Sequence, residues 1–323
     1  MKSCLLNALC ASLISPLLLL ANNSLASTTA YFIGNSLTED SQPNGVAALA
    51  SDNGKDLTVG YHIRSGASLD YIWTHPTDIT NTNSFGGFTN ALSGNAWDIV
   101  TIQPFNSAGS TLASDTQRII DLIGLNEAGP STSTDYYIYD AWPQLPGDYK
   151  TLWTQRIPNT PDQPTTLTRE YFDRLYNNVT SALGDSTSVY TIPIGEVLYN
   201  LDLLFESGAV PSFTDVSQLY RDNFHLEYDI GRWVAANTVY ATIFKENPTG
   251  LQKPLFYYAP TGKSVLTDAL NTQLQSVIWN VVTSDARTGV VPIPPAFYLF
   301  GSGLIGLVGM ARIGNSTPLF ASI

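Results

Sequence analysis

Two short segments far apart in the sequence contain the residue types of a nucleophile, a base and a group that orients the base. The first is Gly34-Asn35-Ser36, and the second holds Asp222 and His225, three residues apart. A serine hydroxyl is a weak nucleophile unless a base within hydrogen-bond reach takes its proton. That base needs a third group to fix its tautomer. The segments therefore predict a triad in which Ser36 attacks, His225 is the base and Asp222 orients it.

The scarcity of histidine narrows the choice of base. The sequence has only His62, His75 and His225, and only the last has a carboxylate three residues before it. A simpler alternative is that Asp222 caps the helix predicted over Tyr228–Phe244 and that His225 packs at its entrance. Gly-Asn-Ser is likewise an ordinary turn sequence after a strand. The presence of both segments in one chain favours the catalytic interpretation.

These segments resemble those of the SGNH (GDSL-type) hydrolase superfamily, whose nucleophile lies in a Gly-Asp-Ser or Gly-Asn-Ser motif directly after the first strand. Ser36 is in such a motif, and Asp222 to His225, followed by a helix, resembles the family's last motif, Asp-x-x-His. The second motif is a glycine whose backbone N–H binds the oxyanion, and Gly66 has the corresponding place. The resemblance covers about residues 29–246 and implies a serine esterase.

The third family motif, usually Gly-x-Asn-Asp after a buried strand, departs from the pattern here. The strand predicted over Trp97–Gln103 continues into Pro-Phe-Asn106, and the glycine is missing. Gln103 and Asn106 both carry an amide NH₂, and Gln103 is slightly preferred. The resemblance thus implies an oxyanion hole formed by Ser36, Gly66 and either Gln103 or Asn106. Alternatively, Asn106 caps the following turn and Gln103 satisfies a buried backbone group.

Alternating strand-like and helix-like segments must position these residues. Apolar runs predict five strands, over Ala30–Ile33, Leu57–Ile63, Trp97–Gln103, Tyr136–Asp140 and Val189–Ile194. Helical patterns cover Gly45–Ser51, Asp115–Leu125, Leu167–Leu183, Gly195–Glu206, Tyr228–Phe244 and Ser264–Val282. This order predicts an α/β fold, a three-layer α/β/α sandwich with a central, mostly parallel five-stranded sheet of the SGNH/flavodoxin-like type. Ligands of such sheets bind beyond the carboxyl ends of the strands, where Ser36, Gly66 and Gln103 follow.

Composition excludes several other classes of protein. The chain has 323 residues, of which 44% are hydrophobic, enough for one large domain with a sizeable core. Its net charge of −12 and the lack of a Lys/Arg stripe argue against a nucleic-acid partner. No metal or cofactor is expected, because His62 and His75 have no second ligand at a recognised spacing. His62 is predicted to point outward from its strand.

The N-terminal 26 residues have the pattern of a signal peptide. Lys2 precedes an apolar stretch over residues 13–21, and Ser24-Leu25-Ala26 fits a small-x-small cleavage site. Both cysteines, Cys4 and Cys10, fall within this segment, so the mature chain would have no thiol. The pattern predicts an exported protein, extracellular or on the cell surface, whose hydrolase domain covers residues 27–250.

The C-terminal residues 291–323 resemble a PEP-CTERM sorting signal of Gram-negative bacteria that make exopolysaccharide. Val291-Pro292-Ile293-Pro294-Pro295 precedes a glycine-containing apolar segment that ends at Arg312. The resemblance implies removal by an exosortase-type enzyme and, before that, membrane anchoring through a transmembrane helix. The alternative is a helix buried in the core, which the glycines disfavour. Residues 251–290 are expected to form a final helix and a spacer.

One long polar segment, residues 142–168, interrupts the alternation of strands and helices. It contains Trp142, Tyr149 and Trp153 beside Pro, Gln and Thr residues. Loops of this length are uncommon unless they are functional. The aromatic side chains could stack on sugar rings at the rim of a cleft, or they could pin the loop to the surface.

Together these features predict an exported serine esterase that hydrolyses short acyl esters. The substrate expected is an acetylated carbohydrate or exopolysaccharide, or another small ester. Two alternatives remain open: a lipase or thioesterase that acts on longer acyl chains, and a non-catalytic surface protein that binds exopolysaccharide on an SGNH scaffold. The irregular third motif is the reason why the second alternative, a non-catalytic protein, stays open.

Overall fold

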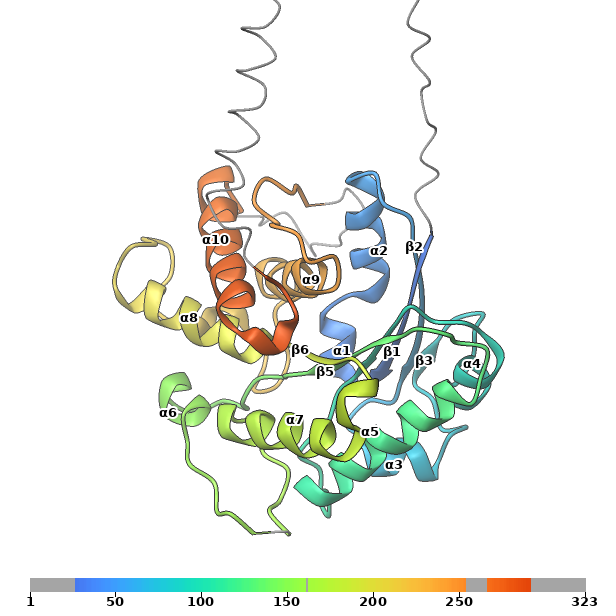
Figure 1. Cartoon of the computed structure of the whole chain (residues 1–323). Helices are drawn as coiled ribbons and strands as arrows, with labels where there is room; N and C mark the ends of the chain where they lie inside the picture. Colours follow the sequence, from blue (N-terminus) through green and yellow to red (C-terminus); the bar gives the residue numbers. More distant parts are fainter. Residues whose placement is uncertain (1–26, 161, 254–265, 292–323) are drawn as a thin grey trace, which may run out of the picture.

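The computed structural model describes residues 27–160, 162–253 and 266–291 of the chain. A central sheet lies between two layers of helices (Figure 1). This arrangement confirms the predicted α/β/α sandwich. The segments that carry the predicted triad lie at one edge of the sheet, as described below.

The sheet has six strands in the order β3-β2-β1-β4-β5-β6. Five of them are parallel, and they correspond to the five predicted strands: β1 (Thr28–Gly34), β2 (Leu57–Ile63), β4 (Ile99–Ile102), β5 (Asp135–Tyr139) and β6 (Val189–Ile192). The expected count of five is corrected by β3 (Asn81–Thr82), which pairs antiparallel with β2 at the edge. A two-residue strand has no sequence period that could have predicted it. The parallel strands have the flavodoxin-like order: β2 lies on one side of β1, and β4, β5 and β6 follow on the other, so the direction in which successive strands are added reverses beside β1.

Two sets of helices cover the sheet, one on each face (Figure 1). One face carries α2 (Pro43–Asp52), α8 (Ile194–Glu206), α9 (Ile230–Ile243) and α10 (Asp268–Ser284). The other carries α3 (Leu69–Thr74), α4 (Phe88–Gly94), α5 (Leu112–Glu127) and α7 (Arg169–Leu183). Short helical elements complete the described chain: α1 (Ser36–Asp40), α6 (Tyr149–Trp153) and the 3₁₀ turns η1 (Gly184–Ser186), η2 (Val216–Leu219) and η3 (Ala286–Thr288).

All six predicted helices are present, with ends that differ by a few residues. The helices that sequence patterns did not predict, α1, α3, α4 and α6, have only five to seven residues. Segments of two turns or fewer show too few apolar positions to reveal a helical period. The N-termini of α1, α3 and α6 are instead set by capping side chains, such as the hydroxyl of Ser68, which accepts from the N–H of Tyr71, whereas α4 follows Gly87 without a side-chain cap.

The carboxyl ends of β1, β2 and β4 lie level with one another. Gly34 pairs with Ile63 on one side, and Ile33 pairs with Ile102 on the other. The loops that follow these three strands therefore leave the sheet at the same edge. This register is what brings the residues after β1, β2 and β4 together.

The prediction that His62 points outward is wrong. Its side chain is fully buried, and its ring packs 5.4 Å from that of Phe88 on α4. Strand β2 is covered on both faces, so alternate residues have no solvent face to point toward. Burial lowers the pKa of His62 to about 4, although Asp78 opposes this, so the imidazole is neutral at pH 7.

The three aromatic side chains of the segment 142–168 are buried rather than displayed at a rim. Trp142, Tyr149 and Trp153 are each at most 3% exposed. The Tyr149 hydroxyl donates to the carbonyl of Gly195 at 2.9 Å, and the Trp153 indole donates to Glu196 at 2.7 Å. These rings therefore pin the loop to α8, and the alternative of sugar stacking by these side chains is set aside.

Helix α10 packs on the same core as the rest of the chain. Asn271 accepts from the Trp233 indole at 2.7 Å, and Gln275 donates to Asn237 at 3.2 Å, both on α9. The expected transmembrane helix is corrected: among residues 27–160, 162–253 and 266–291, no helix is long and apolar enough to cross a membrane. The predicted signal peptide, residues 1–26, and all of the predicted sorting signal, residues 291–323, except Val291 lie outside the described ranges.

Candidate active site

Ser36 is the first residue of α1, directly after β1. The side chain of Asn35 caps this helix by accepting from the N–H of Leu37 at 2.9 Å. Gly34 is required by close packing, because a Cβ there would lie 2.2 Å from Thr38 Oγ1 and 2.8 Å from Gln103 Oε1. The Gly-Asn-Ser motif therefore encodes a tight passage from strand to helix that leaves the Ser36 hydroxyl at the carboxyl edge of the sheet.

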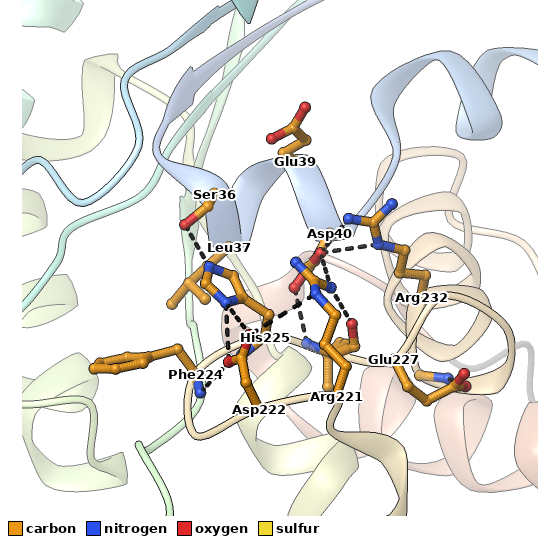
Figure 2. Close-up of polar contacts among 12 residues, drawn as sticks. Ser36, Leu37, Glu39, Asp40, Arg221, Asp222, Phe224, His225, Glu227 and Arg232 are labelled. Atoms are coloured by element: carbon orange, nitrogen blue, oxygen red, sulfur yellow. Dashed lines mark hydrogen bonds and ion pairs between the residues drawn. The ribbon is translucent and has the colours of Figure 1, made fainter. Parts of the chain in front are cut away.

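His225 lies against Ser36, although the two residues are 189 positions apart in the chain. The distance from His225 Nε2 to Ser36 Oγ is 2.8 Å, and His225 Nδ1 lies 2.9 Å from Asp222 Oδ2 (Figure 2). Because a carboxylate only accepts hydrogen bonds, Nδ1 carries the proton and Nε2 is left to accept from the serine. The predicted triad residues are thus brought together in one hydrogen-bonded chain.

Asp222 also shapes the loop that carries the base. Its Oδ1 accepts from the N–H groups of Phe224 at 2.8 Å and of His225 at 2.9 Å. Partial burial raises the pKa of Asp222, but these backbone donors and the imidazole outweigh it and lower that pKa to about 2. The carboxylate is therefore ionised at neutral pH, and the exposure of 48% of its side chain to water also favours the charged form.

A cavity of about 650 Å³ opens beside Ser36 and His225. Its walls come from the segments that follow β1, β2, β4 and β5, together with residues 222–225, the base loop that carries His225. The apolar lining residues are Leu37, Phe105 and Phe224, and the other lining residues are Ser65, Gly66, Asn106 and Gln144. Apart from His225, no titratable side chain lines it among the residues that the structure describes.

Three groups at this cavity can donate to an oxyanion. The backbone N–H of Ser36 and that of Gly66 have no acceptor within the described part of the chain. Gly66 lines the cavity and has φ +70°, a left-handed conformation that favours glycine. The exposed side chain of Asn106 lines the same cavity, and no described residue accepts from its amide.

Gln103, the slightly preferred amide, lies behind the nucleophile instead of in the cavity. It is 1% exposed, and its Oε1 accepts from the Asn35 N–H and the Thr38 hydroxyl, each at 3.1 Å. Its Nε2 donates to the carbonyl of Pro104 at 2.6 Å. Its oxygen holds the start of α1 on the sheet and its nitrogen is bonded to Pro104, so the geometry favours Asn106 as the oxyanion donor.

The segment 142–168 contributes to the site in a way that the sequence pattern did not show. The Trp142 indole donates to the carbonyl of Phe224 at 2.7 Å, and the N–H of Leu145 donates to the carbonyl of Asn223 at 2.8 Å. Gln144, between them, lines the cavity. The loop therefore holds the outer side of the base loop. Its unusual length after β5 was the only signal in the sequence.

A possible metal-binding group lies away from this cavity. Oxygen atoms of Asp148, Asp202 and Glu206 lie within 4.8 Å of one another beside α6 and α8. Lys150 already forms an ion pair with Glu206, and Asp202 accepts from the N–H of Val216 at 2.8 Å. These contacts explain the cluster as a structural one.

Comparisons with known proteins inform the fold. No protein-family profile matches the sequence, and no curated protein is similar to it. The structure is similar to that of a DUF4886 family protein from Bacteroides uniformis ATCC 8492, with a TM-score of 0.54 and 17% identity over 79% of this chain and 95% of the other. It is also similar to TesA, with a TM-score of 0.42 and 15% identity over 67% of this chain and 98% of TesA. At this identity the first likeness shows a shared fold, and the second is too weak to add to it.

Proposed function

We propose that this protein is a serine esterase that hydrolyses short acyl esters, acetyl esters of a carbohydrate above all. The observation that carries the proposal is the unbroken chain of hydrogen bonds from Ser36 through His225 to Asp222 at the mouth of the cavity. A serine, a base and an orienting carboxylate in this geometry constitute an activated nucleophile.

The reaction would proceed in two acyl-transfer steps. Ser36 Oγ attacks the ester carbonyl while His225 Nε2 takes the hydroxyl proton, and the protonated imidazole then gives that proton to the leaving alcohol. Water, activated by the same nitrogen, next attacks the acyl-enzyme and releases the acid. Asp222 holds the Nδ1–H tautomer and stabilises the imidazolium in both steps.

The oxyanion that forms at each step would be bound by the N–H groups of Ser36 and Gly66 and by the side-chain amide of Asn106. Such a donor contributes about 3–4 kcal/mol to transition-state stabilisation, because it is oriented before the charge develops. Asn106 is the one side chain among the three, so it can be removed without altering the backbone.

The lining of the cavity favours a neutral substrate. Among the residues that the structure describes, no cationic side chain lines it to bind a carboxylate or phosphate, and the net charge of −12 disfavours polyanions. Phe105 and Phe224 offer apolar surface, while Gln144 and Ser65 offer hydrogen bonds, a combination that suits a sugar bearing an acyl group. A lipase or thioesterase is a second candidate, because Leu37, Phe105 and Phe224 form an apolar wall that a longer acyl chain could occupy.

Hydrolysis of 4-nitrophenyl acetate, butyrate and octanoate by the full-length protein and its Ser36→Ala variant tests the proposal. We expect Ser36→Ala to abolish turnover with an unchanged circular dichroism spectrum. Ser93→Ala, on the exposed surface of α4, is the matched control and should retain full activity. A preference for octanoate would favour the second candidate. Equal rates for wild type and Ser36→Ala would refute the proposal.

A further inference from the structure

A buried carboxylate lies between the nucleophile helix and the base loop. Asp40 is the last residue of α1 and lies beside Arg221 and Arg232 (Figure 2). Its side chain is 0% exposed. Its Oδ1 accepts from Arg221 Nη1 and from Arg232 Nε, both at 2.9 Å, and its Oδ2 accepts from the N–H of Leu226 at 2.8 Å. A buried charge with three donors is a fully satisfied one. The triad itself does not use Asp40.

The partners of Asp40 flank the base loop, residues 222–225, on both sides. Arg221 precedes the loop and Leu226 follows it. The two are joined to each other as well: the guanidinium of Arg221 donates to the carbonyl of Leu226, and its backbone N–H donates to the carbonyl of His225 at 2.9 Å. One carboxylate therefore holds both ends of the loop that carries the base.

The base loop needs such an anchor, because burial does little to hold it. Asp222 and Asn223 are exposed, and Phe224 and His225 are half-buried. On its outer side the loop is held by Trp142 and its neighbour Leu145, as described above. On its inner side Asp40 joins both ends of the loop to α1, next to the hydrogen bond between His225 and Ser36.

The position of Asp40 ties it to the nucleophile. Ser36 and Asp40 are the first and last residues of the same five-residue helix, so a shift of either one relative to the sheet moves both. Tyr228, 40% exposed, lies over the network, with the guanidinium groups of Arg221 and Arg232 at 4.5 and 4.6 Å from its ring centre. The ring shields the ion pairs from water and strengthens them.

We propose that Asp40 is a positioning residue that sets the distance between Ser36 Oγ and His225 Nε2 by binding Arg221 and Leu226. This inference rests on the proposed esterase function and extends it to a residue outside the triad. Asp40→Asn tests it, because an amide places an NH₂ group where the carboxylate accepts from three donors. At least one donor then faces another donor, and the base loop must move.

The measurement is kcat and KM for 4-nitrophenyl acetate with the full-length protein, well below the melting temperature of each variant. We expect Asp40→Asn to lower kcat about 10²-fold, the usual effect of a displacement of about 1 Å between reacting groups, with KM within about threefold of wild type. The rate at which a fluorophosphonate labels Ser36 should fall in parallel, since that reaction uses the same serine and base.

Asp115→Asn is the matched control. Asp115 is also fully buried and accepts from two hydroxyls, those of Thr165 and Tyr171, but it lies on α5, which contributes no residue to the cavity. We expect its kcat to equal that of wild type whatever its melting temperature. If kcat falls in proportion to the melting temperature in both Asp40→Asn and Asp115→Asn, Asp40 only stabilises the fold, and the inference is overturned.

Two further comparisons make each outcome decisive. If Asp40→Asn does not fold, Arg221→Gln removes the link at the start of the base loop while Asp40 keeps Arg232 and the N–H of Leu226. A wild-type kcat in that variant overturns the inference. If wild type shows no Ser36-dependent hydrolysis, the proposed function fails and the inference with it. If wild type is active and Asp40→Asn is equally active, only the inference fails.

Discussion

Replacing Asp222 by asparagine should place His225 in the tautomer that cannot act as a base. In the structure, Oδ1 of Asp222 accepts from two backbone N–H groups, while Oδ2 lies 2.9 Å from Nδ1 of His225. An asparagine would keep its oxygen on the two N–H groups and turn its NH₂ toward the imidazole. Nδ1 would then have to accept, and the proton would move to Nε2, where it would donate to Ser36.

The size of the effect follows from how exposed this carboxylate is. Where the triad carboxylate is buried, the same substitution lowers kcat by roughly 10⁴-fold. The Asp222 side chain is 48% exposed, so water screens the attraction between its carboxylate and the imidazolium of His225. We therefore expect a smaller loss, of about 10²- to 10³-fold in kcat, which corresponds to about 3–4 kcal/mol in the activation free energy.

The assay is steady-state hydrolysis of 4-nitrophenyl acetate between pH 5 and 9, with Asp222→Ala as the second variant. Alanine leaves Nδ1 to bond to water in either tautomer, so Asp222→Ala should retain more activity than Asp222→Asn if both fold. Circular dichroism and melting temperature establish folding, because Asp222→Ala loses the acceptor of the turn at Phe224. A folded Asp222→Asn protein with kcat within about threefold of wild type would refute the tautomer reasoning.

The other predictions concern the amides of Asn106 and Gln103 and the buried carboxyl group of Asp115. Asn106→Ala should lower kcat roughly 10²- to 10³-fold at an unchanged melting temperature, whereas Gln103→Ala should lower the free energy of unfolding by at least about 2 kcal/mol. Urea unfolding and kcat, measured for both variants, check these expectations. The reverse pattern would make Gln103 the oxyanion donor. Burial, opposed by hydrogen bonds from Thr165 and Tyr171, raises the pKa of Asp115 to about 6. A raised carboxyl pKa contributes stability that is lost as pH rises through that value. When the pH is lowered from 7 to 4.5, the free energy of unfolding of wild type should therefore rise by about 2 kcal/mol relative to that of Asp115→Asn. Parallel pH profiles of the free energy of unfolding in the two proteins would contradict this.

Local patterns in the sequence predicted the elements and the residues of the triad. The apolar runs of β1, β2, β4, β5 and β6 are long enough to show strand character by themselves, and their alternation with long helices leads to a parallel sheet. Ser36 lies in a strand-to-helix turn, and Asp222 and His225 are close in the chain, so each of the two segments can be recognised from its own residues. For that reason the triad could be proposed without coordinates.

Only the tertiary structure decided between chemically equivalent groups. Gln103 and Asn106 carry the same amide, and what separates them is that Asn35 and Thr38, from another strand and helix, occupy the oxygen of Gln103. Asp40 likewise looks like an ordinary acidic residue at a helix end until Arg221 folds onto it. Burial and hydrogen-bond partners depend on segments far apart in the chain, which no local pattern contains. The sequence thus determined which residues could do chemistry here, and packing determined which of them face the cavity.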